Sequence, residues 1–275
     1  ALRQYFLILF VFKLSTWALL LSFTTIAEPE SEIFILTKFP ILRNIKKYNL
    51  AIPIFKKLLI WPILKPNKLT IFEKVFYLST KEYSNPSRDL YSYRNIYSDH
   101  EKKILEKKIK PGDNCIDIGS NIGFFTWMFL NYNKGKGKVF CFESNLVVYE
   151  ILKKNFINDK TVKTYLGLVG INNGNNKFIV IDELIKERID FIKIDIDGPD
   201  LNALKSCENI IDKYEPKIII ELSEASYREH GINYTEVIFF LKEKKYEIYE
   251  IDKNLTYFDR RLKHDEVINV YAEKI

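Results

Sequence analysis

Cysteine and histidine are scarce in this chain of 275 residues, which contains three of each. Cys115, Cys141 and Cys207 do not follow the spacing of a zinc site, and their odd number does not suit a framework of disulfides. Two of them fall inside predicted buried strands, where cysteine behaves as a small apolar residue. The histidines are scattered along the chain. The sequence therefore predicts reduced, structural cysteines and no metal site.

An excess of positive charge is lacking over the C-terminal part of the chain. Residues 109–275 hold 24 Lys and Arg against 27 Asp and Glu, whereas residues 1–108 hold 18 against 9. A nucleic-acid substrate needs positive charge around the active site, so this distribution argues against one. Hydrophobic residues make up 47% of the chain and aromatic residues 15%, so a large buried core is expected and disorder is not.

A glycine turn between a predicted strand and a predicted helix is the most informative stretch. An apolar run that ends at Asp117 is followed by this turn and then by an apolar helix. Two glycines allow a tight turn and a close approach of the backbone to a ligand. In an open parallel α/β sheet, ligands bind outside the carboxyl ends of the strands. The stretch therefore predicts a binding site formed by Asp117, Gly119, Ser120, Asn121 and Gly123.

A second predicted strand, residues 138–142, leads to Glu143, twenty residues after Gly123. An acid at this position can accept hydrogen bonds from both hydroxyls of a ribose, as in dinucleotide-binding domains. The dinucleotide pattern Gly-x-Gly-x-x-Gly is absent, because Ser120 and Asn121 follow the first glycine. The turn instead suits a ligand without phosphates that carries an amino-acid tail, such as S-adenosylmethionine. A nicotinamide cofactor and an ordinary turn without a ligand are the alternatives.

Five motifs in this order resemble the FkbM-type methyltransferases, over residues 97 to 275. The resemblance implies a class I methyltransferase (Rossmann-like) fold, with a seven-stranded sheet, an antiparallel last strand and helices on both faces. It also implies S-adenosylmethionine as the methyl donor, and usually O-methylation of a sugar or another hydroxyl-bearing natural product. In the family an acidic residue precedes the donor site, which makes Glu101 a cofactor candidate or else a solvated helix acid. The motifs are Lys110-Pro-Gly-Asp113 with Asp117 to Gly123, Phe142-Glu143, Leu152 to Asn155, Ile181 to Leu184, and Ile192 to Gly198.

The chain departs from the family pattern in three places. Asp197-Gly-Pro-Asp200 replaces the usual Glu-Gly-x-Glu, and Ser144 replaces a proline that commonly follows the acid of the second strand. The segment that precedes Ile181 is also much shorter than usual. A shorter segment leaves less chain for an acceptor pocket. A membrane-attached nucleoside-binding module that has lost catalysis is therefore a second hypothesis, and a nicotinamide-dependent oxidoreductase is a third.

A group of carboxylates is predicted near the carboxyl end of the fourth strand. Strand alternation places Lys193, Asp195 and Asp197 on one face, and the fifth strand delivers Glu221 to the same edge. Methylation of a hydroxyl requires the removal of a proton. Asp195 or Asp197 is the first candidate for the base, followed by Glu221 and by His230, which is otherwise an exposed loop residue. A buried Lys193 is expected to pair with these acids and not to act as a nucleophile.

The N-terminal part is predicted to be a hydrophobic and basic helical extension. Residues 5–27 are strongly apolar apart from Lys13, and at about 1.5 Å per residue they could cross a hydrocarbon core of about 30 Å. A membrane anchor, a signal peptide and a buried helix are the alternatives. Residues 38–74 then carry nine basic residues and one acid, Glu73. Such a strip suits an anionic membrane surface on the cytoplasmic side, or packs its apolar side on the catalytic domain.

The predicted organisation has three parts: a hydrophobic segment (1–30), a basic amphipathic extension and linker (31–96), and a methyltransferase domain (97–275). The expected protein is an S-adenosylmethionine-dependent O-methyltransferase with a small-molecule, glycan or lipid-linked acceptor that carries a hydroxyl. It is expected at the cytoplasmic face of a membrane, through residues 1–74, or otherwise in the cytoplasm.

Overall fold

The computed structural model describes residues 67–71, 74–78, 90, 98–172, 177–252 and 255–274. The chain divides into two compact units, residues 1–66 with 88–94 and residues 67–87 with 95–275. All the strands and helices named below belong to the second unit. The predicted hydrophobic segment and most of the basic extension lie outside the described residues. Within the described ranges, no helix combines the length and the apolar character needed to cross a membrane.

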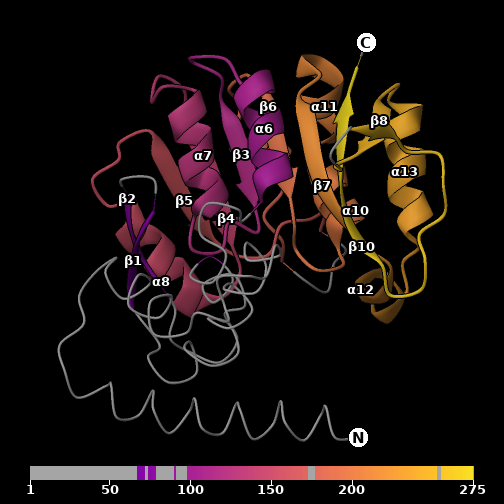
Figure 1. Ribbon diagram of the computed structural model, residues 1–275, viewed down its shortest axis with the longest axis horizontal. Helices are drawn as coiled ribbons and strands as arrows, with labels where there is room; N and C mark the ends of the chain where they lie inside the picture. Colours follow the sequence, from indigo (N-terminus) through magenta and orange to yellow (C-terminus); the bar gives the residue numbers. More distant parts are fainter. Residues whose placement is uncertain are drawn as a thin grey trace, which may run out of the picture. The chain divides into compact units, whose positions relative to one another are not determined.

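An eight-stranded sheet in the order β5-β4-β3-β6-β7-β10-β8-β9 forms the centre of this unit (Figure 1). The strands from β5 to β7 in this order are parallel, and β10 runs antiparallel to β7 and β8. The predicted sheet with an antiparallel last strand is therefore confirmed, with the short β9 as an additional strand. The strands are β3 (Cys115–Ile118), β4 (Val139–Glu143), β5 (Val162–Leu166), β6 (Phe191–Ile194), β7 (Lys217–Ser223), β8 (Glu247–Glu250), β9 (Thr256–Tyr257) and β10 (Val267–Glu273).

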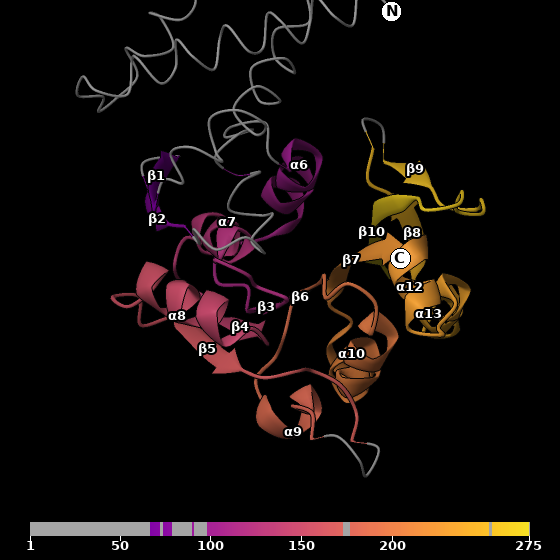
Figure 2. The same ribbon diagram turned by 90° about the horizontal axis from the view of Figure 1, so that it is seen from below.

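Helices cover both faces of the sheet, as predicted. Figure 2 shows α6, α7 and α8 on one face and α9, α10, α12 and α13 on the other. Every residue of β3, β4 and β6 is buried, which is expected of parallel strands covered on both sides. The helices are α6 (Asp99–Lys108), α7 (Phe124–Tyr132), α8 (Leu146–Asn155), α9 (Ile181–Leu184), α10 (Asp200–Ser206), α11 (Glu208–Tyr214), α12 (Glu224–Glu229) and α13 (Tyr234–Glu243).

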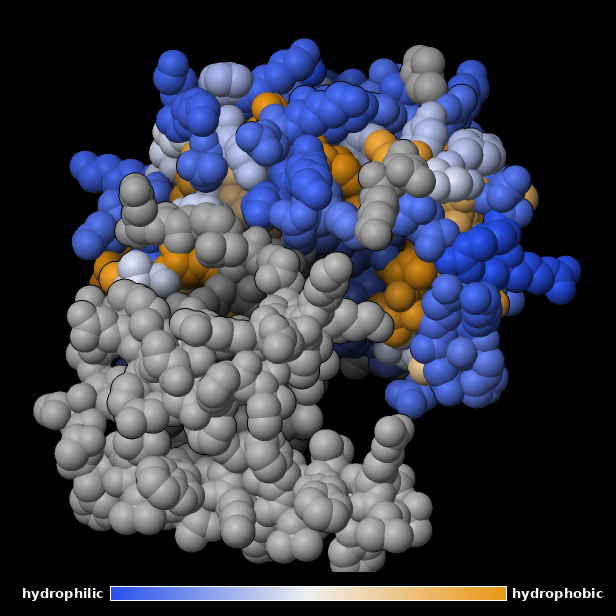
Figure 3. Space-filling model, in the orientation of Figure 1, coloured by the Kyte–Doolittle hydropathy of each residue, from blue (hydrophilic) through white to orange (hydrophobic). Residues whose placement is uncertain are grey.

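The outer surface of α6 is hydrophilic in Figure 3, because its exposed residues are charged, whereas its apolar residues Ile104 and Leu105 are buried. The sequence predicts a helix from Asp99 to Lys110, and α6 confirms it up to Lys108. The sequence predicts a capping-box-like helix start at Asn233 and Glu236, and α13 begins with one: the Asn233 side chain accepts a backbone N–H, and the Glu236 side chain accepts from the Asn233 backbone N–H. All three cysteines are free and buried, as predicted.

Three elements end earlier than the sequence predicted. The sequence predicts a third strand from Val162 to Val169, whereas β5 stops at Leu166, because the backbone of Gly167 has a φ of 152° and leaves the strand. The sequence also predicts a short helix from Asp182 to Arg188, whereas α9 ends at Leu184. The fourth strand, predicted to reach Asp197, ends at Ile194.

A hairpin that the sequence did not predict is formed by β1 (Lys68–Ile71) and β2 (Lys74–Tyr77). The Asn155 amide at the end of α8 holds it, because its Oδ1 accepts from the Tyr77 backbone N at 2.6 Å and its Nδ2 donates to the Tyr77 carbonyl at 3.1 Å. Phe76 is fully buried, with its ring 6.2 Å from that of Phe124. The sequence predicts only part of the basic amphipathic extension over these residues.

Candidate active site

The glycine turn lies between β3 and α7, as predicted. Gly119 and Gly123 have φ values of +78° and +92°, in the region that favours glycine. A Cβ on Gly119 would lie 1.9 Å from the Asp195 carbonyl oxygen, and one on Gly123 would lie 2.2 Å from the Phe156 ring. Both glycines are therefore required by the packing of the turn against neighbouring segments.

Glu143, at the end of β4, holds the same turn from the side. Its Oε2 accepts from the Asn121 backbone N at 3.0 Å, and its Oε1 accepts from the Asn145 backbone N at 2.7 Å. The side chain is buried, and burial raises the pKa of Glu143, although these N–H groups oppose the rise. Each carboxylate oxygen has a second lone pair, so Glu143 can still accept bonds from a ligand.

The Ser120 hydroxyl makes its hydrogen bonds to other groups of the protein. It donates to the Asp117 carbonyl at 2.6 Å and accepts from the Phe142 backbone N at 3.0 Å. The residue is buried. The hydroxyl of Ser120 therefore ties the turn to β4 and has no hydrogen left to offer a ligand.

Asp117 is fully buried at the carboxyl end of β3. Its Oδ2 accepts from the Thr126 hydroxyl at 2.6 Å, whereas its Oδ1 has no hydrogen-bond partner among the residues that the structure describes. Burial raises the pKa of Asp117, and the charge of Lys193 and the Thr126 hydrogen bond oppose that rise. Thr126 was not predicted, although it is a hydroxyl residue in an otherwise apolar helix start. Asp117 therefore has one carboxylate oxygen available for a further donor.

Lys193 is the register neighbour of Asp117, in the middle of β6. Its ammonium is 2.8 Å from Asp195 Oδ2 and 4.4 Å from the centre of the Phe125 ring, and the residue is 2% exposed. Burial alone would lower the pKa of Lys193, but the Asp195 and Asp117 charges outweigh burial and raise it. The predicted pairing of Lys193 with the carboxylates is therefore confirmed.

Asp195, Asp197 and Glu221 form the carboxylate group that the sequence predicted. Oxygen atoms of all three lie within 4.8 Å of one another. Burial first, and the Asp195 charge second, raise the pKa of Asp197 and raise that of Glu221 to about 8. The prediction that strand alternation brings Asp197 to this face is wrong, because β6 ends at Ile194 and Asp197 adopts a left-handed conformation with φ 55°. A turn beyond the strand, not the strand itself, carries Asp197 to the group.

His230 lies at the end of α12, beside the same loop. Its Nδ1 is 2.8 Å from the Ser226 carbonyl oxygen, and a Cβ added to Gly198 would lie 2.3 Å from that nitrogen. The His230 side chain is exposed. His230 therefore packs on the loop that carries Asp197.

Glu101, at the start of α6, reaches the sheet through Asn269. Its Oε1 accepts from Asn269 Nδ2 at 2.8 Å, and Asn269 on β10 is the register partner of Glu221 on β7. Directly paired residues on neighbouring strands point to the same face, so Glu101 lies on the face of the carboxylate group. Sequence reasoning missed Asn269, since nothing in the chain's pattern reveals the register between β7 and β10.

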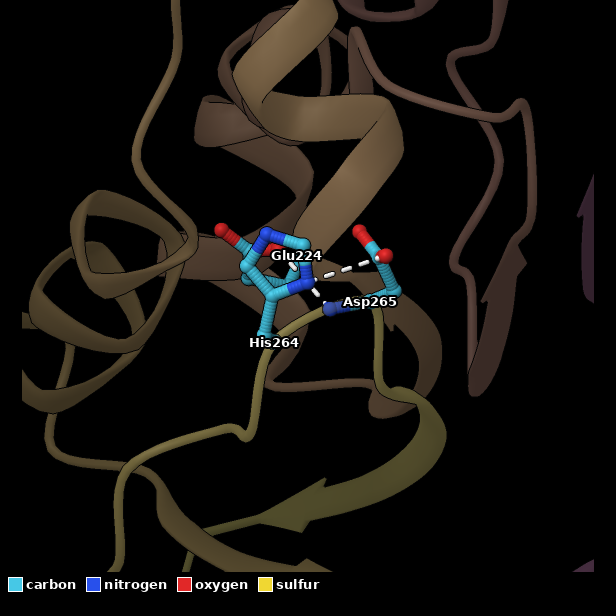
Figure 4. A group of neighbouring side chains, drawn as sticks. All are labelled: Glu224, His264 and Asp265. Atoms are coloured by element: carbon cyan, nitrogen blue, oxygen red, sulfur yellow. Dashed lines mark hydrogen bonds and ion pairs between the residues drawn. The ribbon is translucent and has the colours of Figure 1, made fainter.

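Two groups of described residues bring three potential cation ligands together. One is Asp195, Asp197 and Glu221, and the other is Glu224, His264 and Asp265, also within 4.8 Å (Figure 4). A basic side chain already neutralises part of each group. Lys193 pairs with Asp195 in the first, and Arg228 contacts both Glu224 at 2.6 Å and Asp265 at 2.9 Å in the second.

The fold and the site together define a class of protein. The order β5-β4-β3-β6-β7-β10-β8 with an antiparallel β10, and a glycine turn after β3, are those of the class I methyltransferase fold. Within that class, the family model described as "Methyltransferase FkbM domain" matches residues 176–248. The resemblance to the FkbM-type methyltransferases is therefore confirmed over this stretch, and the comparisons support a methyltransferase.

Solved structures similar to this chain include a methyltransferase FkbM from Methylobacillus flagellatus, at 20% identity and a TM-score of 0.44. That match covers 60% of this chain and 44% of the other, so this chain spans less than half of that protein's length. A precorrin-6y C5,15-methyltransferase from Geobacter metallireducens is 15% identical, with a TM-score of 0.46 over 73% and 94% of the two chains. An rRNA methylase from Streptococcus thermophilus is 15% identical, with a TM-score of 0.45 over 66% and 97%. None of the curated proteins matches the chain.

Proposed function

We propose that this protein is an S-adenosylmethionine-dependent methyltransferase that methylates a hydroxyl of a small-molecule, glycan or lipid-linked acceptor. The observation that carries the proposal is the Oδ1 of Asp117 beside the glycine turn, a buried atom that has no hydrogen-bond partner among the described residues. This buried acceptor fits a donor such as the ammonium of an amino-acid tail, because an unmet buried polar atom costs free energy until it is paired. Glu143 at the end of the adjacent strand offers acceptors to a ribose.

When bound, S-adenosylmethionine supplies a methyl group that is activated for transfer. The chain's own residues then have two tasks, to hold the acceptor hydroxyl and to take its proton. Glu221 suits the second task, because a group with a pKa of about 8 takes up and releases a proton close to neutral pH. Asp195, Asp197 and Glu221 lie close enough to titrate together, so we assign the base to this group as a unit.

The donor assignment is tested by calorimetry with S-adenosylhomocysteine. We expect binding to the wild type, and a loss of about 1–3 kcal/mol of binding free energy in Asp117→Ala and in Glu143→Ala, because each removes a buried hydrogen-bond partner. Asp159→Ala is the matched control, since Asp159 precedes β5 and its side chain bonds only to Thr161 in the described structure. Absence of binding to the wild type, or unchanged affinity in both site variants, would refute the assignment.

The reaction is tested by incubating the protein with methyl-labelled donor and with host glycan or lipid extracts. Transfer of label to an acceptor that contains a hydroxyl supports the proposal. Donor binding without any transfer would favour the nucleoside-binding module, and preference for NAD over S-adenosylmethionine would favour the oxidoreductase. Transfer to a nitrogen or carbon atom would keep the methyltransferase and overturn O-methylation.

A further inference from the structure

Asp200 is a buried acid that the proposed chemistry does not use. It begins α10 and is 2% exposed. Its Oδ1 accepts from the Ile196 backbone N at 3.2 Å, and its Oδ2 accepts from the Gly198 backbone N at 3.1 Å. Both donors belong to the loop between β6 and α10, and Asp197 lies between them. One carboxylate therefore holds this loop on both sides of Asp197.

The backbone conformation of this loop is a sparsely populated one, which these hydrogen bonds stabilise. Asp197 is left-handed with φ 55°, a region that residues with a side chain seldom adopt. Gly198 has a φ of +134° and leaves no room for a Cβ beside the His230 ring. Backbone in sparsely populated regions persists only when its surroundings determine it. The two hydrogen bonds to Asp200 fix this conformation next to the carboxylate group.

Tyr227 connects the same acid to the neighbouring strand. It is 1% exposed on α12, and its hydroxyl, which has one hydrogen to donate, lies within reach of two acceptors, the Glu221 carbonyl at 3.2 Å and the Asp200 carboxylate. Burial raises the pKa of Asp200 to about 6, while the hydrogen bonds from Ile196, Tyr227 and Gly198 oppose the rise. The buried contact thus joins the loop of Asp197 to the strand of Glu221.

We propose that Asp200 and Tyr227 form a clamp that fixes the Asp197 carboxylate relative to Glu221, and that both are positioning residues for the methyl acceptor. The effect on methyl transfer rests on the proposed function, whereas the effect on the loop does not. Without the clamp the Ile196 and Gly198 amides lose their acceptor, and the left-handed turn at Asp197 relaxes. Donor binding at the glycine turn should change little, because the donor residues Asp117 and Glu143 hydrogen-bond elsewhere.

Three variants of the full chain separate positioning from general stability. Asp200→Asn keeps the volume but turns one acceptor into a donor, and Tyr227→Phe removes only the hydroxyl. Asp182→Asn is the matched control, because the Asp182 carboxylate likewise accepts two backbone N–H groups, from Asn209 at 2.7 Å and Ile210 at 3.0 Å. These belong to α11, outside the carboxylate group.

Two readouts report on the loop directly. The chain has only three histidines, so the His230 ring-proton resonance can be assigned in NMR spectra by comparison with His230→Asn. We expect this resonance to shift in Asp200→Asn and Tyr227→Phe and to stay in Asp182→Asn. Amide exchange at Ile196 and Gly198 should rise by about tenfold or more in Asp200→Asn, as expected when a buried hydrogen bond is lost.

Two further readouts test the functional consequence. Transfer of label at saturating donor should fall by about tenfold or more in Asp200→Asn, and less in Tyr227→Phe, while S-adenosylhomocysteine affinity stays within about threefold. Unchanged His230 resonances and loop exchange in both variants would overturn the clamp, and so would equal changes in Asp182→Asn. If Asp200→Asn does not fold, Tyr227→Phe decides alone. A wild type that fails to bind S-adenosylhomocysteine would refute the proposed function, while the His230 and exchange readouts would still decide the clamp.

Discussion

Lys193 shows what a single buried charge does for this site. Of the residues that the structure describes, it is the only buried Lys or Arg, and it faces Asp195 and Asp117. Lys193→Met keeps most of the volume and leaves those acids without a cation. We expect a loss of about 3–5 kcal/mol in the free energy of unfolding near neutral pH, the usual effect of breaking a buried ion pair. Urea denaturation of the variant and the wild type measures this difference.

The control for this prediction is Lys108→Met. Lys108 pairs with Glu273 at 2.6 Å, but both side chains are about one fifth exposed, at 22% and 21%. Removal of such a pair should cost no more than about 1 kcal/mol. The Lys193→Met loss should also shrink at acid pH, because protonated carboxyl groups no longer repel each other. A Lys193→Met loss no larger than the Lys108→Met loss would show that the buried charge contributes no more than a partly exposed one.

Glu221 is the second residue with a testable charge. In the folded protein its pKa is about 8, above the ordinary value of 4.5, so between these values the folded state holds a proton that the unfolded chain has released. The contribution of Glu221 to the free energy of unfolding is therefore fully present below about pH 4.5 and is lost as the pH rises through about 8. Glu221→Gln cannot titrate. Between about pH 5 and pH 9, we expect the free energy of unfolding of this variant to fall by about 1–3 kcal/mol less than that of the wild type.

The measurement is denaturant unfolding across that pH range for the wild type, Glu221→Gln and Glu150→Gln. Glu150 is an exposed acid on α8, and its variant should follow the wild-type curve. Burial raises the pKa of Asp200 to about 6, so Asp200 also lowers the stability of the protein as the pH rises, but at lower pH than Glu221. The effect of Glu221 is therefore the difference between the wild-type and Glu221→Gln curves. A Glu221→Gln curve with the wild-type slope would contradict the raised pKa.

At the scale of elements, the glycine turn after β3 leaves no room for a side chain at Gly119. Gly119→Ala would place a Cβ 1.9 Å from the Asp195 carbonyl oxygen and strain a backbone at φ +78°. Gly112→Ala imposes a similar strain, at φ +94°, with nothing within 4 Å. We expect a cost of about 1–2 kcal/mol in Gly112→Ala and about 3–5 kcal/mol in Gly119→Ala, because the second adds a clash with backbone. Thermal unfolding measures the cost of each variant, and calorimetry measures its donor binding. Similar costs would mean that the loop at Asp195 moves away from the added Cβ.

Elements whose cause is local were predictable from the sequence. The apolar run before Asp117, the glycines after it and the capping box of α13 each depend on neighbouring residues alone. The hairpin β1–β2 was missed because its support is distant: the Asn155 amide and the aromatic side chains of α7 come from other parts of the chain. The turn at Asp197 was missed for the same reason, because its hydrogen bonds to Asp200 are not visible as periodicity.

At the scale of the whole molecule, the site is assembled from residues far apart in the sequence. Parallel strands end at one edge, so Asp117, Glu143 and Asp195 were predictable as neighbours. Glu101 and Asn269 are brought together across 168 positions, and Asn269 meets Glu221 only through the antiparallel register of β10. That register follows from the packing of the complete sheet, and the chain carries no local signal of it.

The uneven charge of the chain leads to a prediction for the whole molecule. Residues 38–74 carry nine basic residues and one acid, whereas residues 109–275 are slightly acidic. We propose that the basic stretch attaches the protein to anionic membrane surfaces. Each well-placed cation contributes about 1 kcal/mol there, so Lys56→Glu with Lys57→Glu should weaken binding to anionic vesicles by more than about tenfold. The same changes at Lys242 and Lys245, on the acidic part, should have little effect.

Cosedimentation with vesicles of phosphatidylcholine and phosphatidylserine, compared with phosphatidylcholine alone, measures this attachment. Binding through the basic stretch should fall as salt rises from about 0.05 M to about 0.5 M, because the screening length shortens severalfold. Binding through the apolar residues 5–27 should instead resist salt and disappear when residues 1–30 are deleted. The deletion variant therefore separates the two sources. A full-length protein that ignores anionic vesicles at low salt would rule out both forms of attachment.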